Sequence, residues 1–136
     1  MIYAVIDTNV IVSSLKSAHP DSATVRVMDA VYCGKVKIIV NDAILAEYDD
    51  VLHRERLQLD AERCDFILSL ISDIGMRIDP VPTDAEMPDA DDRVFFEVTL
   101  AGLDIGDAHL VTGNMKHYPM ASFVVTPAQF CEIAGL

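Results

Sequence analysis

Basic residues are scarce in this 136-residue sequence, which has 10 lysines and arginines against 22 aspartates and glutamates. The net charge of −12 argues against a surface that coats nucleic acid, because such surfaces are strongly basic. It is compatible with a metal site or with a basic protein partner. Most surface acids are expected only to interact with solvent, so charge alone selects no function.

Cysteine is also rare, and Cys33, Cys64 and Cys131 are widely spaced, with no pair at zinc-ligand spacing. This pattern does not suggest a disulfide framework and favours reduced thiols in a cytoplasmic protein. No apolar run approaches the ~20 residues of a membrane span, and the start of the chain lacks a signal-peptide pattern. We therefore expect a cytoplasmic protein that does not associate with a membrane.

The distribution of apolar residues predicts the fold class. Length predicts a single domain over residues 1–136. Short apolar runs alternate with helical patterns, which predicts an α/β protein of Rossmann-like kind, with helices on both faces of a parallel sheet. The expected strands are 2–6, 36–40, 76–78, 109–112 and 123–125. The expected helices are 10–15, 22–32, 42–53, 61–74, 93–101 and 127–134.

Asp7 is the first candidate for a functional side chain, because it directly follows the buried run 2–6. In parallel α/β sheets, ligands bind beyond the carboxyl ends of the strands. Asp7 is expected at such an end. The alternative is that Asp7 merely caps the helix that follows, although Thr8 and Asn9 could also do this.

Two further acids lie on predicted helices. Asp92 precedes Phe95 and Phe96 by three and four residues, so it heads the core-facing stripe of its helix. Glu47 lies three residues after Ile44 and borders the apolar stripe of its own helix. The alternatives are a helix cap for Asp92 and a solvated surface acid for Glu47.

Asn114 adds an amide after the fourth apolar run, although a simple turn would also explain an asparagine there. Carboxylates ~5 Å apart repel one another by about 3 kcal/mol at an effective dielectric of 20, so a cluster of acids needs a cation. Oxygen ligands favour Mg²⁺ or Mn²⁺ over zinc. The sequence contains no glycine-rich phosphate-binding loop.

Five segments along nearly the whole chain form a more specific pattern: VIDTNVIVSSL at 5–15, AEYDDVL at 46–52, DADDRVFFEVTLAG at 89–102, HLVTGN at 109–114 and FVVTPAQF at 123–130. In this order they resemble PIN-domain proteins, and more narrowly the small prokaryotic PIN proteins grouped as toxins of toxin–antitoxin pairs. The resemblance implies a three-layer α/β/α sandwich with a central parallel sheet. It also implies an Mg²⁺- or Mn²⁺-dependent ribonuclease with RNA as substrate, a cognate antitoxin as partner, and a homodimer.

Matched by motif, the resemblance implies that Asp7, Glu47 and Asp92 are the first, second and third acids of the catalytic metal site. It places Asn114 where many PIN proteins have a fourth aspartate, so one charge is missing there. Thr8 or Asn9 is expected to position Asp7.

Other functions stay open at this stage. The neutral side chain of Asn114 and the charge of −12 favour a PIN-like binding module with little catalysis. An Asp-x-Asp phosphatase is disfavoured because position 9 is asparagine. A receiver domain would need paired acids after the first strand and a suitably placed lysine, which are not found.

Overall fold

The computed structural model describes all residues from 1 to 136 and contains one five-stranded sheet in the order β3-β2-β1-β4-β5. Every neighbouring pair of strands is parallel, as the continuous apolar runs predicted. The strands are β1 (Ile2–Ile6), β2 (Val36–Val40), β3 (Met76–Arg77), β4 (Asp107–Val111) and β5 (Val124–Val125).

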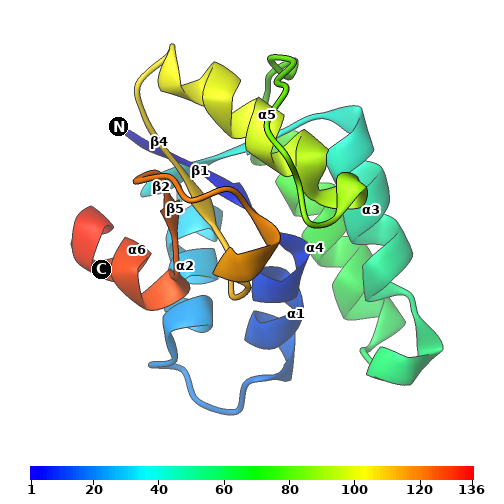
Figure 1. Cartoon of the computed structure of the whole chain (residues 1–136). Coiled ribbons are helices and arrows are strands. Elements are labelled where there is room, and N and C mark those ends of the chain that lie inside the picture. Colours follow the sequence, from blue (N-terminus) through cyan, green and yellow to red (C-terminus); the bar gives the residue numbers. More distant parts are fainter.

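Six α-helices and three short 3₁₀ turns connect these strands or, in the case of α6, follow the last one (Figure 1). The helices are α1 (Thr8–Lys16), α2 (Ala23–Tyr32), α3 (Asp42–Leu52), α4 (Ala61–Ile74), α5 (Arg93–Leu103) and α6 (Pro127–Ala134). The 3₁₀ turns are η1 (Glu55–Leu57), η2 (Ala90–Asp92) and η3 (Met115–His117). None of the helices has the length and apolar character that crossing a membrane requires.

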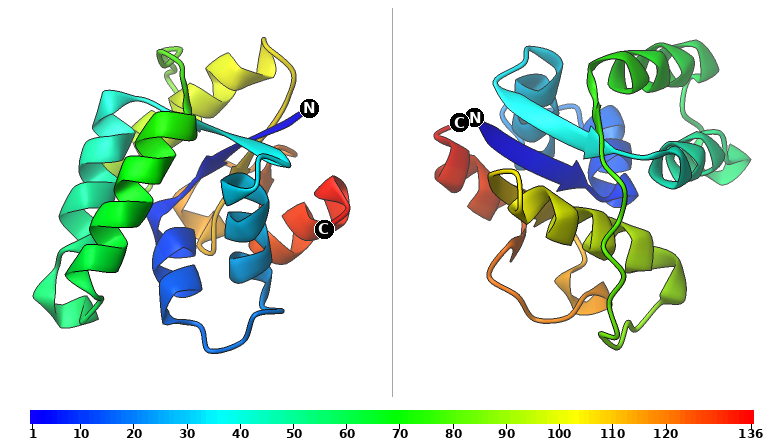
Figure 2. Two further views of the ribbon diagram at one scale, coloured as in Figure 1. Left: turned by 180° about the vertical axis from the view of Figure 1, so that it is seen from behind. Right: turned by 90° about the horizontal axis from the view of Figure 1, so that it is seen from above.

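The helices lie on both faces of the sheet, which gives three layers (Figure 2). On α5, Gly102 approaches the sheet so closely that an added Cβ would lie 3.2 Å from the Cβ of Ala108. On α6, the ring of Phe130 meets His109 edge-on at 5.8 Å. Because Ala108 and His109 are adjacent in β4, they point to opposite faces, and α5 and α6 therefore cover opposite faces.

The remaining helices complete the layers around one core. α2 packs against α1 and α6, while α3 and α4 pack against each other beside β2. The core is a cluster of 30 buried residues, in which Ala4, Val5 and Ile6 of β1 are fully buried. A capping box between Thr126 and Gln129 starts α6, within the segment TPAQ whose residue types are typical of such a box.

The strand order reverses beside β1. The chain passes from β1 to β2 and β3 on one side, and then returns to place β4 on the other side of β1. The backbone N–H of Asp7 donates to the carbonyl of Val111 at 2.9 Å, so β1 and β4 end side by side. Open α/β sheets bind their ligands at such a reversal, beyond the carboxyl ends of the strands. Asp7 and Thr112 are the first residues past these two ends.

Candidate metal centre

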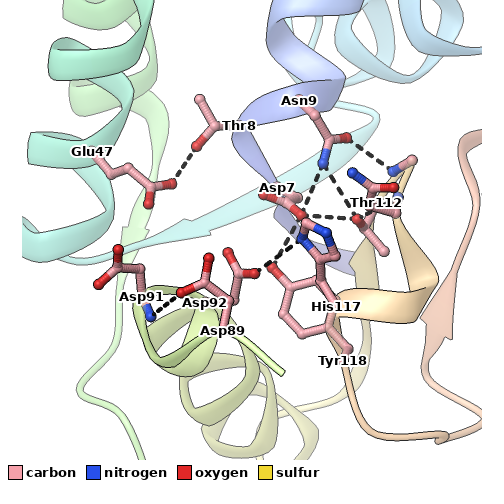
Figure 3. A network of polar contacts seen from close by, with 12 residues as sticks. Asp7, Thr8, Asn9, Glu47, Asp89, Asp91, Asp92, Thr112, His117 and Tyr118 are labelled. Atoms are coloured by element: carbon pink, nitrogen blue, oxygen red, sulfur yellow. Dashed lines mark hydrogen bonds and ion pairs between the residues drawn. The ribbon is translucent and has the colours of Figure 1, made fainter. Parts of the chain in front are cut away.

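Asp7 is held in one orientation by three hydrogen bonds (Figure 3). Its Oδ2 accepts from Nδ2 of Asn9 at 3.0 Å, from the hydroxyl of Thr112 at 2.8 Å and from the hydroxyl of Tyr118 at 3.0 Å. The residue is only 5% exposed. All three hydrogen bonds go to the same oxygen, so Oδ1 remains available to a ligand.

Neither Asp7 nor Asp92 caps a helix with its side chain. Asp7 is the residue before α1 and Asp92 is the residue before α5, yet neither carboxylate accepts a hydrogen bond from a backbone N–H of the helix it precedes. The capping alternative for these two acids is therefore wrong. Their side chains turn toward each other and toward α3 instead (Figure 3).

Asn9 links the ends of β1 and β4. While its Nδ2 donates to Asp7, its Oδ1 accepts from the backbone N–H of Gly113 at 2.9 Å. Gly113 leaves room for this contact, since a Cβ there would lie 3.1 Å from that same oxygen. Asn9 therefore orients the carboxylate of Asp7 and ties it to the end of β4.

Thr8 does not contact the carboxylate of Asp7, contrary to the expectation that it could position this acid. Its hydroxyl donates to Oε2 of Glu47 at 2.5 Å. The reason is that adjacent side chains diverge at the start of α1, so that Thr8 points to α3 (Figure 3). Thr8 positions Glu47 rather than Asp7.

Glu47 is half-buried on the side of α3 that faces Asp7. Burial raises the pKa of Glu47 above its ordinary value, and the negative charge of Asp7 raises it further. The hydrogen bond from Thr8 opposes this rise because it stabilises the carboxylate form. Glu47 is thus not a solvated surface acid.

Asp92 is the least satisfied acid of the group. Its side chain is 13% exposed, and its Oδ2 is buried without a hydrogen-bond partner, at 3.3 Å from Nδ1 of His117. Burial and then the charge of Asp7 raise the pKa of Asp92 to about 6, while His117 lowers it. A buried oxygen without a partner is costly, and a bound cation would remove that cost.

The two acids that precede Asp92 have other places. Asp89 caps η2, because its side chain accepts a hydrogen bond from the backbone N–H of Asp91 at 3.0 Å. Asp91 is exposed. Asp92 is therefore the acid of this segment that turns inward.

Asn114 lies close to the group in the chain, but its side chain forms no hydrogen bond in the structure. The residue is exposed, and only its backbone N–H is engaged, with the hydroxyl of Thr112 at 3.0 Å. The polar side chains from this part of the chain that contact Asp7 are Thr112 and Tyr118. A ligand role for Asn114 stays a prediction.

The donor set fits a small divalent cation that keeps part of its water shell. No three histidine, cysteine, aspartate or glutamate side chains lie close enough to hold one ion together. Mg²⁺, however, usually retains several waters and is bound through one or two carboxylates. Two such oxygens are Oδ1 of Asp7 and Oδ2 of Asp92, which has no hydrogen-bond partner although Nδ1 of His117 lies 3.3 Å away. Direct binding by Glu47 as well would need a movement of its side chain.

Three residues of this network were not predicted from the sequence. Thr112 directly follows strand β4, just as Asp7 directly follows strand β1. This shared position at a strand end was the one feature of the sequence that could have predicted their contact. Tyr118 and His117 reach the group only because η3 folds the chain back. Burial, and then the charge of Asp7, raises the pKa of Tyr118 well above its ordinary value, so its hydroxyl stays a donor.

Comparison with known proteins agrees with this geometry. A family model described as "PIN domain" matches residues 3–116, which include the three acids and Asn114. No curated protein and no solved structure matches the chain. PIN domains are generally metal-dependent nucleases, and the five-stranded parallel sheet with six helices has the architecture of this nuclease fold. The chain belongs to the PIN-domain family.

Proposed function

We propose that this protein is a ribonuclease that hydrolyses RNA phosphodiester bonds with Mg²⁺ or Mn²⁺. The observation that carries the proposal is the pairing of Asp7 and Asp92 at the strand reversal. One carboxylate is held by three hydrogen bonds to one oxygen, and the other has a buried oxygen without a partner. Oδ1 of Asp7 accepts no hydrogen bond, and Oδ2 of Asp92 has no hydrogen-bond partner and only the side chain of His117 beside it at 3.3 Å, so each carboxylate offers an oxygen to a ligand.

Each side chain has a distinct part in this proposal. Asp7 and Asp92 hold the ion, and Glu47 completes the site from α3, oriented by the hydroxyl of Thr8. When bound, Mg²⁺ or Mn²⁺ lowers the pKa of a water molecule and neutralises charge that builds up on the phosphate. Tyr118 keeps Asp7 in one orientation and stays protonated.

We further propose that the protein is the toxin of a toxin–antitoxin pair and acts in the cytoplasm as a homodimer. The charge of −12 supports a basic segment of an antitoxin as partner. The three unpaired cysteines support a reducing compartment. A gene for a small DNA-binding antitoxin next to the gene of this protein would support the pairing.

A second function is favoured by one specific observation. Asn114 carries no charge, and no third acid lies close enough to bind an ion together with Asp7 and Asp92. Both features favour a PIN-like module that binds other proteins and cleaves RNA weakly or not at all.

An RNA cleavage assay with added Mn²⁺ separates the two functions. We expect the natural protein to cleave single-stranded RNA only with the metal, and Asp7→Asn to lose this activity. Asp91→Asn is the matched control because Asp91 is exposed beside Asp92 and should leave cleavage unchanged. No cleavage by the natural protein at any Mn²⁺ concentration would favour the binding module.

A further inference from the structure

The largest hollow of the molecule does not lie over the carboxylates but begins beside them. It is an open hollow of about 610 Å³ between α1 and the segment around η1, a volume within the range of about 300–1,000 Å³ typical of ligand clefts. Asn9, the residue that orients Asp7, is at one end of its lining. Further along it are Val12 and Lys16 from α1, and Arg56 and Leu57 from η1. We refer to these lining residues as the α1–η1 groove.

A second, smaller hollow of about 180 Å³ continues the α1–η1 groove. The two share Lys16 and Leu57 in their linings, so they are neighbours on the surface. The second hollow adds Arg63 from the start of α4. Together the two hollows form a path that runs from Asn9, beside Asp7, along α1 and η1 to α4.

The lysine and arginine side chains in this path are unusual because they form no hydrogen bonds with the rest of the protein. Six of the ten lysines and arginines donate hydrogen bonds to the chain itself, namely Arg26, Lys35, Lys37, Arg54, Arg77 and Arg93. Arg93 directly follows Asp92, but its guanidinium donates to the carbonyls of Thr83 and Ala85 at 2.9 Å each. Of the four cations that remain, Lys16, Arg56 and Arg63 line the two hollows.

The geometry points to the α1–η1 groove and its continuation as the binding site for a single strand of RNA that leads to the Asp7–Asp92 pair. This inference rests on the proposed ribonuclease function and specifies where its substrate binds. Lys16, Arg56 and Arg63 bind successive phosphates, and the apolar side chains of Val12 and Leu57 contact bases, which all present an apolar face.

Charge explains why the cations must be gathered in one place. A molecule at −12 repels RNA, but salt at 0.1 M screens charges beyond about 10 Å. In the α1–η1 groove a phosphate therefore meets the exposed charges of Lys16 and Arg56, and in the second hollow the single acid Asp60 lies with Lys16 and Arg63. Lys116, the fourth unengaged cation, lies on η3 beside Tyr118, where the strand would leave the acids.

The groove favours RNA over an acidic peptide because it is continuous with the acids. Asn9 both lines the groove and donates to Asp7. A strand bound along the groove therefore brings a phosphate toward the carboxylates that hold the ion. An acidic peptide would meet the same cations and the same repulsion near Asp7 and Glu47, but it offers no phosphodiester bond to the site that these carboxylates form.

Binding of a labelled ten-nucleotide single-stranded RNA, measured by fluorescence anisotropy in EDTA over a range of salt concentrations, tests this inference. EDTA prevents cleavage, so binding is measured independently of catalysis. The test variant is Lys16→Gln/Arg56→Gln. The control, Lys35→Gln/Arg77→Gln, changes the net charge equally at residues outside the groove, and thermal melts verify that both variants are folded.

We expect the groove variant to bind RNA at least about tenfold more weakly at 0.1 M salt. We also expect the slope of log K against log salt to fall by about 1.4, because each lost phosphate contact on a single strand removes about 0.7. The control should keep the slope of the natural protein. Equal slopes in the groove variant and the natural protein would overturn the inference, as would undetectable RNA binding by the natural protein.

The same proteins distinguish a failure of the groove from a failure of the proposed function. If the natural protein cleaves RNA with Mn²⁺ but the groove variant binds RNA normally, the ribonuclease stands and the groove is refuted. If RNA binding depends on the groove but no cleavage occurs with Mn²⁺, the groove stands and the ribonuclease is refuted. A third outcome would assign the groove to an acidic protein partner. In that case the groove variant would no longer bind a labelled oligoglutamate peptide but would still bind RNA like the natural protein.

Discussion

Replacing Asp92 by Asn should stabilise the metal-free protein at neutral pH. Burial and the charge of Asp7 raise the pKa of Asp92 from 3.8 to about 6, so the folded state holds this proton more tightly than the unfolded chain does. Between about pH 4 and pH 6, stability therefore falls as pH rises. At pH 7 the full cost of the charge is present, and Asn removes it while keeping the shape of the side chain.

The size of the effect follows from the shift. A change of about two pKa units corresponds to about 3 kcal/mol, and partial solvent screening reduces this to roughly 1–2 kcal/mol. For a chain of this size that is a rise in melting temperature of roughly 4–8 °C. The gain should disappear near pH 4, where the aspartate of the natural protein is protonated as well.

Thermal and urea unfolding of both proteins in EDTA, at pH 4 and pH 7, measure this difference. Asp91→Asn is the control, since Asp91 is exposed and its replacement should change stability by less than about 0.5 kcal/mol. Added Mn²⁺ should stabilise the natural protein by mass action and leave Asp92→Asn nearly unaffected. A variant that is less stable at pH 7, or one whose gain is the same at both pH values, would refute the reasoning.

Three further changes test the surroundings of the acids. Tyr118→Phe removes one hydrogen bond to the charged Asp7 and should destabilise the protein by about 1.5–3 kcal/mol in urea unfolding, whereas an unchanged midpoint would contradict that bond. Thr8→Val removes the donor that holds down the pKa of Glu47, so the acidic limb of Mn²⁺ binding should move to higher pH in calorimetric titrations. Asn114→Asp should tighten Mn²⁺ binding, because hard cations favour charged oxygen ligands, and should change stability by less than about 0.5 kcal/mol because the position is exposed. Equal affinities would remove Asn114 from the site.

Much of the fold was predictable because local patterns agree with it. The apolar run of β1 and the capping box of α6 gave these elements the bounds that the structure shows. The parallel arrangement followed from strands that are apolar on both faces. The 3₁₀ turns were not predicted, since single turns of three residues have no periodic signal.

The candidate site was predictable in its location but not in its contacts. Ligands bind beyond the carboxyl ends of parallel strands, so an acid directly after an apolar run was enough to single out Asp7. Its partners Thr112 and Tyr118 follow it by 105 and 111 residues, so their contacts depend on β4 lying beside β1 and on the turn η3. Of the two residues expected to position Asp7, Asn9 does so and Thr8 does not, because a sequence does not show which of two neighbouring side chains faces another helix.

The central claim, that Asp7 and Asp92 hold the metal ion, is tested most directly by calorimetric titration with Mn²⁺. The titration compares the natural protein, the variants Asp7→Asn and Asp92→Asn, and the control Asp91→Asn. If Asp7 and Asp92 hold the ion, the natural protein and the control should bind Mn²⁺ with the same affinity. Each of the other two variants should bind it at least about tenfold more weakly, since each loses one anionic oxygen ligand. Binding of Mn²⁺ by Asp7→Asn and Asp92→Asn with the affinity of the natural protein would contradict the claim.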